Sequence, residues 1–188
     1  MGNLSLIANK EGFVGPTFSL RNRLKRGSWK LAWLLLARWT PPLFHRWRIL
    51  VLRMFGAQVS WRAYVYADVE IWAPWHLAIA DYGTLARGVN CYNMAPVSVG
   101  VRAVVSQGAH LCTGTHDYLD PAFPLTARPI SIGRRAWVCA NAFVGPGITV
   151  SDGAILAAAA VAHRDLEPWS IYAGNPAVFI RARPEIND

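Results

Sequence analysis

The residues of this chain best suited to chemistry stand at the start of a polar loop. His116 and Asp117 follow the residues Leu-Cys-Thr-Gly-Thr, which begin at Leu111. Imidazole has an unperturbed pKa of about 6.5, so a neutral histidine can accept a proton at working pH. The other four histidines do not sit directly at the loop mouth: His45, His76, His110 and His163. Of these, His76 and His110 are interpreted as residues that cap turns. His116 is therefore the histidine that stands where the scaffold opens to make a site.

Asp117 has more than one possible role. Its carboxylate could orient the imidazole of His116 or contact a substrate. An aspartate at the start of a loop also often hydrogen-bonds its own backbone. The sequence leaves these alternatives open.

An aliphatic residue returns every six positions on both sides of this loop. The series has fifteen places, and thirteen of them hold Val, Ile or Leu: Val59, Val65, Ile71, Ile79, Leu85, Cys91, Val99, Val105, Leu111, Ile132, Val138, Val144, Val150, Leu156 and Ala162. Two-residue slips follow Ile71 and Cys91, and the polar segment 117–129 interrupts the series after Leu111. Ala, Gly, Thr or Val occupies twelve of the fifteen positions four residues later.

A period of six fits neither a helix nor an ordinary half-buried strand, whose periods are 3.6 and 2. It predicts a short strand and a tight turn, with three such units closing one triangular coil. We expect the aliphatic residue to point inward and the small residue to let the chain turn. The predicted fold is mainly β: a parallel β-helix of about five coils, an irregular extruded loop at 117–129, and a C-terminal tail at 169–183.

The N-terminal third has a different composition. Residues 1–28 are rich in Gly, Asn, Ser and basic residues and predict an irregular arm. Aromatic residues and leucines follow, and Pro41-Pro42 divides them because proline is excluded from a helix interior. We predict helices at 28–39 and 42–54, the second ended by Gly56. The expected division is an N-terminal arm and helical segment at 1–57 and a β-helix domain with its tail at 58–188.

The net charge of +8 belongs to this N-terminal third. Residues 1–58 hold ten Lys or Arg against Glu11 alone, whereas residues 59–188 hold nine Arg against ten acidic residues. Either these helices simply pack on the rest of the protein, or their basic and aromatic side chains lie at a membrane interface or hold an amphiphilic substrate. The aromatic residues concerned are Trp29, Trp33, Trp39 and Trp47. No nucleic-acid recognition motif accompanies the charge, so nucleic acid is not an expected partner.

Cysteine usage favours a reducing location. Cys91, Cys112 and Cys139 are odd in number and lack metal-type spacing, so neither a disulfide framework nor a metal site is indicated. No signal peptide is visible. The longest apolar run near the N-terminus, Leu31 to Ala37, is far too short to span a bilayer. We expect a cytoplasmic protein, with contact at the inner face of the membrane if the helices bind lipid.

The chain resembles the hexapeptide-repeat acyltransferases, and most closely the group named as colanic acid biosynthesis acetyltransferases. The resemblance rests on the hexads and on three segments: 111–118, Ile-Gly-Arg-Arg-Ala-Trp at 132–137, and Ala-Gly-Asn-Pro-Ala-Val-Phe-Ile-Arg at 173–181. The stretch 45–57 matches the narrower group. The resemblance implies a left-handed β-helix, a homotrimer with sites at its interfaces, acetyl-CoA as co-substrate without a required metal, and His116 as catalytic base.

The resemblance also places binding residues. Tyr92 and Asn93 match acceptor-binding positions, although an Asn in a solenoid can equally form a stacking ladder. Matches to acetyl-CoA contacts are Trp137, Ala140 and Ala158, which packing and the need for small corners also explain, and Arg164 and Arg181 near the phosphates. This sequence departs from many relatives in this region, with Arg164 for a Lys, His163 for a Thr and Val178 for a basic residue.

The expected activity is acetyl-CoA-dependent O-acetylation of a sugar hydroxyl in exopolysaccharide or glycolipid biosynthesis. Two alternatives stay open. One is N-acetylation of an amino sugar or amino acid, and the other is a non-catalytic β-helix scaffold, because hexads alone do not require catalysis.

Overall fold

The computed structural model describes residues 18–186, and the predicted arm therefore lies mostly outside the described residues. Two α-helices come first, α1 (Leu20–Leu36) and α2 (His45–Met54), and the 3-10 turn η1 (Pro42–Phe44) precedes the second. A further 3-10 turn, η2 (Pro74–His76), occupies the first slip of the six-residue series. The predicted pair of helices divided by Pro41-Pro42 is confirmed.

Helix α1 begins eight residues earlier than the sequence predicted. Ser19 caps it, because its Oγ accepts a hydrogen bond from the N–H of Asn22 at 3.3 Å. One turn on, Arg26 Nε donates to Asn22 Oδ1 at 2.9 Å. These local bonds stabilise the first turns of α1, in a basic segment that its composition predicted to be irregular.

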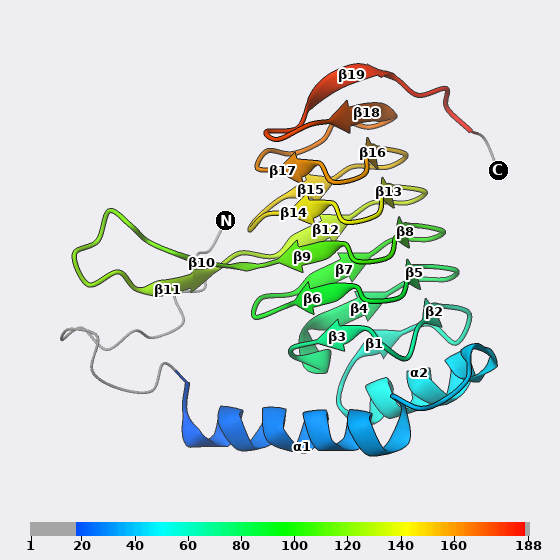
Figure 1. The fold of residues 1–188 in the computed structure, drawn as a ribbon, viewed down its shortest axis with the longest axis vertical. Helices are drawn as coiled ribbons and strands as arrows, with labels where there is room; N and C mark the ends of the chain where they lie inside the picture. Colours follow the sequence, from blue (N-terminus) through cyan, green and yellow to red (C-terminus); the bar gives the residue numbers. More distant parts are fainter. Residues whose placement is uncertain (1–17, 187–188) are drawn as a thin grey trace.

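The strands form three parallel faces of a triangular prism (Figure 1). The first face contains β1 (Gln58–Val59), β4 (Leu77–Ile79), β7 (Val97–Val99), β12 (Ile130–Ile132) and β15 (Thr149–Val150). The second contains β2 (Tyr64–Val65), β5 (Thr84–Leu85), β8 (Val104–Val105), β13 (Trp137–Val138), β16 (Ile155–Leu156) and β18 (Ser170–Ala173), with β19 (Val178–Ala182) added antiparallel. The third contains β3 (Glu70–Ile71), β6 (Asn90–Tyr92), β9 (His110–Cys112), β14 (Phe143–Val144) and β17 (Val161–Ala162).

The strand register places one hexad residue directly on the next. On the second face Val65 aligns with Leu85, and the series continues through Val105, Val138 and Leu156. Every one of the fifteen hexad positions is buried in a single core. The three faces give five complete coils in the described residues, and Leu166 and β18 begin a sixth. The predicted β-helix is confirmed.

In the turns between faces, the buried small residue and the residue that reverses the chain are not the same residue, contrary to the prediction. Except for Thr115 in the hairpin, the small residue four places after an aliphatic residue is buried, as Ala103 and Ala142 are at 0% exposure. The left-handed backbone lies one residue earlier, for example at Arg102 and Asn141, both with φ of 55°. A small side chain is therefore needed because it points into a narrow corner, whereas its neighbour carries the reversal of the chain.

The loop at 117–129 does leave the prism, but part of it is regular. Strand β10 (Gly114–His116) pairs antiparallel with β11 (Leu125–Ala127), and the hairpin projects away from the coils (Figure 1). His116 faces Leu125 at the outer end of this ladder. The hairpin leaves the third face after β9 and returns to the first face at β12.

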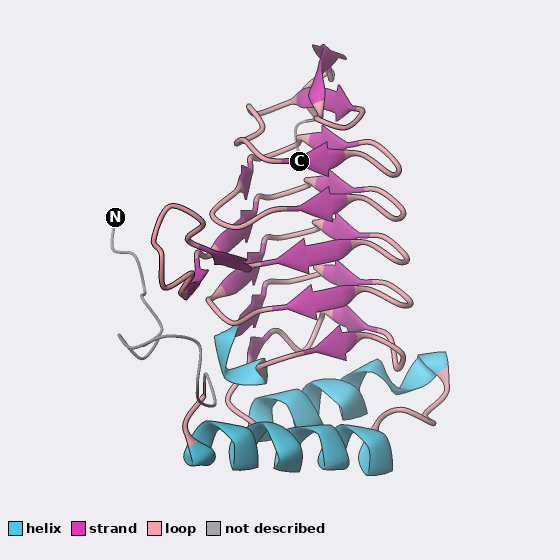
Figure 2. Cartoon of the chain, turned by 60° about the vertical axis from the view of Figure 1, so that its left-hand side comes forward, coloured by secondary structure: helices cyan, strands magenta, loops and turns pink. Residues whose placement is uncertain are grey.

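The helices cover one end of the prism and the β18–β19 pair lies at the other (Figure 2). The indole N–H of Trp29 donates to the carbonyl oxygen of Ile71 at 2.7 Å, and that of Trp33 to Ala67 at 3.2 Å. Side chains from both helices, including Ile49 and Leu52, share one buried core with the coils. The helical segment is thus packed on the first coil.

Candidate active site

His116 is held by the far side of its own hairpin. Its Nδ1 lies 2.9 Å from the carbonyl oxygen of Phe123, and the two rings stack with centroids 4.4 Å apart and planes 10° apart. Phe123 has a φ of 47°, a left-handed conformation that is uncommon for an aromatic residue. The imidazole is therefore fixed from one edge and one face.

The Phe123 contact also indicates which tautomer the neutral ring adopts. A carbonyl oxygen can only accept a hydrogen bond, so Nδ1 must carry the proton in this arrangement. In the neutral imidazole the lone pair is then on Nε2. Sequence reasoning missed Phe123, because the turn beyond the paired residues of β10 and β11 brings it against His116.

Asp117 makes the local backbone bonds that its position allowed. Its Oδ1 accepts a hydrogen bond from the N–H of Leu119 at 3.1 Å, and its own N–H donates to the carbonyl of Pro124 at 3.0 Å. The side chain is exposed. These contacts shape the start of the loop, and they favour the turn-forming alternative over a role in orienting His116.

Tyr92 and Asn93 lie below the hairpin in different environments. Asn93 is fully buried, and its amide accepts from the N–H of Ala73 and donates to the carbonyl of the same residue at 3.0 and 2.6 Å. The side chain of Asn93 thus bridges two coils through the backbone of Ala73, without forming a ladder of stacked Asn residues. The ring of Tyr92 is partly exposed and touches the base of the hairpin, since a Cβ on Gly114 would lie 2.8 Å from Tyr92 Cε1.

Trp137, Ala140 and Ala158 lie on another edge of the prism. Ala140 and Ala158 occupy equivalent turns of two successive coils between the second and third faces, and Ala159 N–H donates to the carbonyl of Ala140 at 2.9 Å. Trp137 projects from the second face, 44% exposed, and its indole N–H donates to Ser106 Oγ at 2.8 Å. The stacked turns form a ridge of small side chains beside a fixed aromatic ring.

The candidate base and the predicted positions Trp137, Ala140 and Ala158 therefore do not meet within one chain. The hairpin of His116 leaves the edge between the third and first faces, whereas Ala140 and Ala158 mark the edge between the second and third. Arg164 is exposed on the His116 edge, two residues after β17, and Arg181 is exposed on β19. One prism carries a candidate base at one edge and a candidate cofactor ridge at another.

The cysteines offer no competing nucleophile. Burial raises the pKa of the Cys91 thiol to about 12 and also raises the pKa values of Cys112 and Cys139. All three are free thiols. Within residues 18–186, no three His, Cys, Asp or Glu side chains come together as a metal site would require.

The sequence matches known acetyltransferases over almost its whole length. It is 35% identical over 185 residues to the Escherichia coli K12 protein WcaF, whose name assigns it to colanic acid biosynthesis as an acetyltransferase, covering 98% of this chain and 99% of that protein. It is 26% identical over 129 residues to the galactoside O-acetyltransferase of the same strain, covering 69% of this chain and 58% of that protein. No family model matches the chain.

Solved structures share the fold at lower identity. A hexapeptide-repeat acetyltransferase of Vibrio cholerae O1 biovar eltor, in complex with acetyl coenzyme A, superposes with a TM-score of 0.78 and 20% identity, covering 90% of this chain and 93% of that one. A maltose O-acetyltransferase of Clostridium difficile 630 superposes with a TM-score of 0.77 and 19% identity, covering 89% of this chain and 90% of that one. With the full-length match to WcaF, these similarities show that the chain belongs to the hexapeptide-repeat acyltransferases, enzymes built on a left-handed parallel β-helix.

Proposed function

We propose that the enzyme transfers an acetyl group from acetyl-CoA to a sugar hydroxyl, with His116 as general base. The observation that carries this proposal is the hydrogen bond from Nδ1 to Phe123, which assigns the basic lone pair to Nε2. The names of WcaF and galactoside O-acetyltransferase support a sugar acceptor, and the Vibrio complex supports acetyl-CoA. Membership of an enzyme family replaces the scaffold alternative.

In the proposed reaction, His116 Nε2 removes the proton of the acceptor hydroxyl as its oxygen attacks the thioester carbonyl. A C–O bond forms, the C–S bond breaks, and CoA leaves as a thiolate that takes up the proton. The stacked ring of Phe123 and its carbonyl hold the imidazole in one orientation, so less freedom is lost when the acceptor arrives.

His116→Gln tests this role. We expect kcat for CoA release in the presence of acceptor to fall by about 10²–10⁴-fold, the usual contribution of a positioned base. His76→Gln is the matched control, because His76 is also partly exposed but lies in η2, outside the hairpin. Equal activity in the two variants would reject His116 as the base. An amino-sugar acceptor preferred over its hydroxyl analogue would instead favour N-acetylation.

We further propose a homotrimer in which one subunit supplies the His116 hairpin and its neighbour supplies the ridge of Ala140 and Ala158. The separation of these two edges on a single prism supports this arrangement. Trp137 would then lie beside the acyl end of acetyl-CoA, and Arg164 and Arg181 would meet its phosphates.

Mixed oligomers test the shared site. His116→Gln and Ala158→Trp should each be inactive alone, the second because its side chain fills the ridge. Refolding the two together should restore part of the activity, because some interfaces then combine an intact hairpin with an intact ridge. Sedimentation equilibrium should give a trimer. A fully active monomer, or no recovery in verified mixed trimers, would contradict the proposal.

The helical segment is proposed to bring the enzyme to an anionic membrane surface without spanning it. Leu20, Leu24, Leu31 and Leu35 are between 58% and 68% exposed. Their spacing of four, seven and four places them along one side of α1. Trp29 and Trp33 occupy the opposite side and are buried against the prism. In residues 18–186 no helix is long and apolar enough to cross a membrane.

Charge supports an anionic partner for this leucine stripe. Arg21, Arg23 and Lys25 lie at the N-terminal end of α1, where the helix dipole is already positive and basic residues are unfavourable. Their charge is therefore not explained by helix stability. Arg48 is different, because it is fully buried and its guanidinium donates to backbone carbonyls.

Vesicle co-sedimentation tests the membrane contact with the full chain. We expect binding to vesicles with anionic lipid that weakens as salt increases. The triple variant Leu24→Gln, Leu31→Gln, Leu35→Gln should lose binding. The double variant Tyr118→Gln, Leu119→Gln is the control, because both residues are about 80% exposed on the hairpin. Absence of wild-type binding at low salt would reject membrane contact. Self-association that does not depend on salt would instead show that the exposed leucines of α1 contact another copy of the protein.

A further inference from the structure

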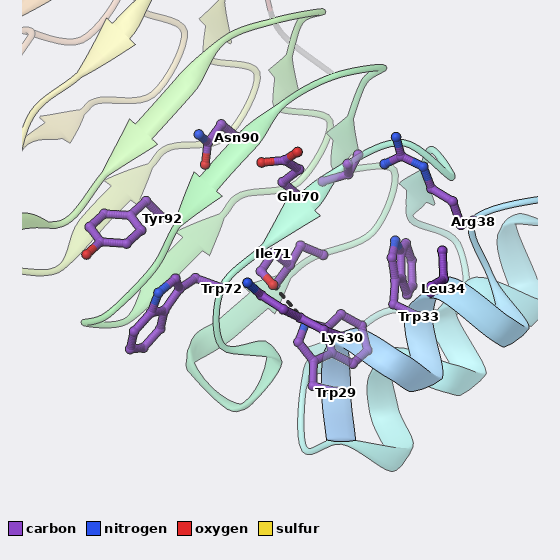
Figure 3. Close-up of a pocket in the computed structure, with 11 residues that line it drawn as sticks. Trp29, Lys30, Trp33, Leu34, Arg38, Glu70, Ile71, Trp72, Asn90 and Tyr92 are labelled. Atoms are coloured by element: carbon purple, nitrogen blue, oxygen red, sulfur yellow. Dashed lines mark hydrogen bonds between the residues drawn. The ribbon is translucent and has the colours of Figure 1, made fainter. Parts of the chain in front are cut away.

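A cavity of about 580 Å³ lies between α1 and the third face of the prism (Figure 3). Trp29, Trp33 and Trp72 form much of its wall. Its volume is within the usual range for a small-molecule site. None of the predicted cofactor positions lines this cavity.

One end of the cavity reaches the base of the catalytic hairpin. Tyr92 lines this end, with Trp72 beside it at a ring-centroid distance of 5.8 Å (Figure 3). Tyr92 touches Gly114, and His116 is two residues further along β10, about 7 Å at the rise of a strand. A molecule seated against these rings is therefore one sugar unit from the candidate base.

The cavity also has polar and charged groups suited to a sugar. Glu70 and Asn90 are register partners on neighbouring coils and lie side by side (Figure 3), where they can bond adjacent hydroxyls. Lys30 and Arg38 come from the α1 side, and Arg38 lies at the end away from Tyr92 (Figure 3). Lys30 extends toward Ile71 and Trp72 (Figure 3), so the lining carries one cationic side chain beside the aromatic rings and another at the far end.

The position of α1 over the third face is fixed by hydrogen bonds. The hydrogen bonds from the Trp29 and Trp33 indoles to strand-side carbonyls hold α1 at a fixed separation from the third face. Packing of the helix on the prism explains these two buried tryptophans. It does not explain the exposed Lys30 and Arg38, which line the same cavity as Glu70 and Asn90.

We propose that this cavity is an acceptor subsite for a sugar residue joined to an anionic group, either a phosphate or a carboxylate. The pyranose ring packs against Trp72 and Tyr92, its hydroxyls bond Glu70 and Asn90, and Lys30 and Arg38 supply positive charge for the anion from the two ends of the cavity. The inference rests on the proposed transfer to a sugar and adds the part of the acceptor that lies beyond the reacting residue. Exposed Leu34 at the cavity edge leads to the leucine stripe of α1.

Saturation-transfer NMR with His116→Gln protein, without acetyl-CoA, separates binding from catalysis. The probes are hexose 1-phosphates, methyl uronides and neutral methyl glycosides of the gluco, galacto and manno series. We expect at least one anionic probe to bind more tightly than its neutral counterpart. Preference for the phosphates identifies a phosphate-linked sugar, and preference for the uronides identifies an acidic sugar.

Two pairs of variants locate the binding. Lys30→Gln with Arg38→Gln should raise the Kd of the anionic probe by about fivefold to tenfold, whereas Arg21→Gln with Arg46→Gln, an equal charge change outside the cavity, should leave it unchanged. Trp72→Ala should weaken every probe that binds, and Trp61→Ala should not.

The outcomes distinguish this inference from the proposed function. Equal binding of anionic and neutral probes, no binding of any probe, or equal effects in the two charge variants would overturn the subsite even if acetyl transfer to a small sugar is measured. Site-specific binding in a protein that transfers no acetyl group would retain the subsite and reject the activity.

Discussion

The coils and the helical segment are stabilised in different ways. In the coils one contact repeats, because Val65, Leu85 and Val105 stack directly along a face. In the helical segment a few individual contacts hold each turn, and the buried Arg48 bonds Val65, Thr40, Pro41 and Pro42. A repeated contact requires similar residues at a regular spacing in the sequence, whereas an individual contact does not. The difference predicts which changes spread through the molecule and which remain local.

Leu85→Ala should give the largest loss of stability. Leu85 is fully buried between coils, so its truncation leaves a cavity that costs about 3 kcal/mol of unfolding free energy. Leu34→Ala on α1 is the control, since Leu34 is 59% exposed and should change stability by less than about 0.5 kcal/mol. Urea unfolding at one fixed protein concentration measures both. Equal losses would mean that Leu34 is buried in the assembled protein.

Arg48→Met should give a smaller and local loss. The Arg48 guanidinium donates to Thr40 Oγ1, Pro41 O and Pro42 O, each at 2.8 Å. Loss of these partners leaves buried acceptors unsatisfied and should cost about 2 kcal/mol. Hydrogen exchange should increase in α2 and the Pro41-Pro42 turn but not in β13 or β14. The exposed Arg46→Met should be close to neutral. Uniform exchange throughout the prism would contradict a local role.

The same contrast explains what the sequence could predict. The hexads predicted every buried stack, because each coil imposes the same geometry on its residues. The start of α1 was missed, since a single cap at Ser19 outweighs composition. His116 was predicted at the loop mouth, but its partner Phe123 and the cavity beside Tyr92 depend on the hairpin turn and helix packing. Contacts between segments distant in sequence cannot be recognised from the residues around either segment.

The smallest expected effect is the pH response of the helical segment. Burial and nearby Arg48 lower the pKa of His45, while the Val65 carbonyl opposes the shift. The ring packs against Tyr64 and Tyr66 and lies 3.2 Å from an Arg48 nitrogen, so protonation places two positive charges together. Because the folded pKa is below the unfolded value of about 6.5, the neutral ring stabilises the fold above that pH. This stabilisation is lost as the pH falls from about 6.5 through the folded pKa.

Hydrogen exchange between pH 7.5 and 5 should therefore show α2 and the first coil loosening before the central coils. His45→Gln should reduce this acid sensitivity, and His163→Gln should leave it unchanged. Burial also lowers the pKa of His110, which stands beside Phe143 on the third face, so His110→Gln should reduce acid sensitivity in the coils instead. An unchanged acid response of α2 in His45→Gln would show that another group controls it. A response in which His110→Gln alone protects α2 would mean that the helical segment and the prism unfold as one unit, which removes the distinction between local and repeated contacts.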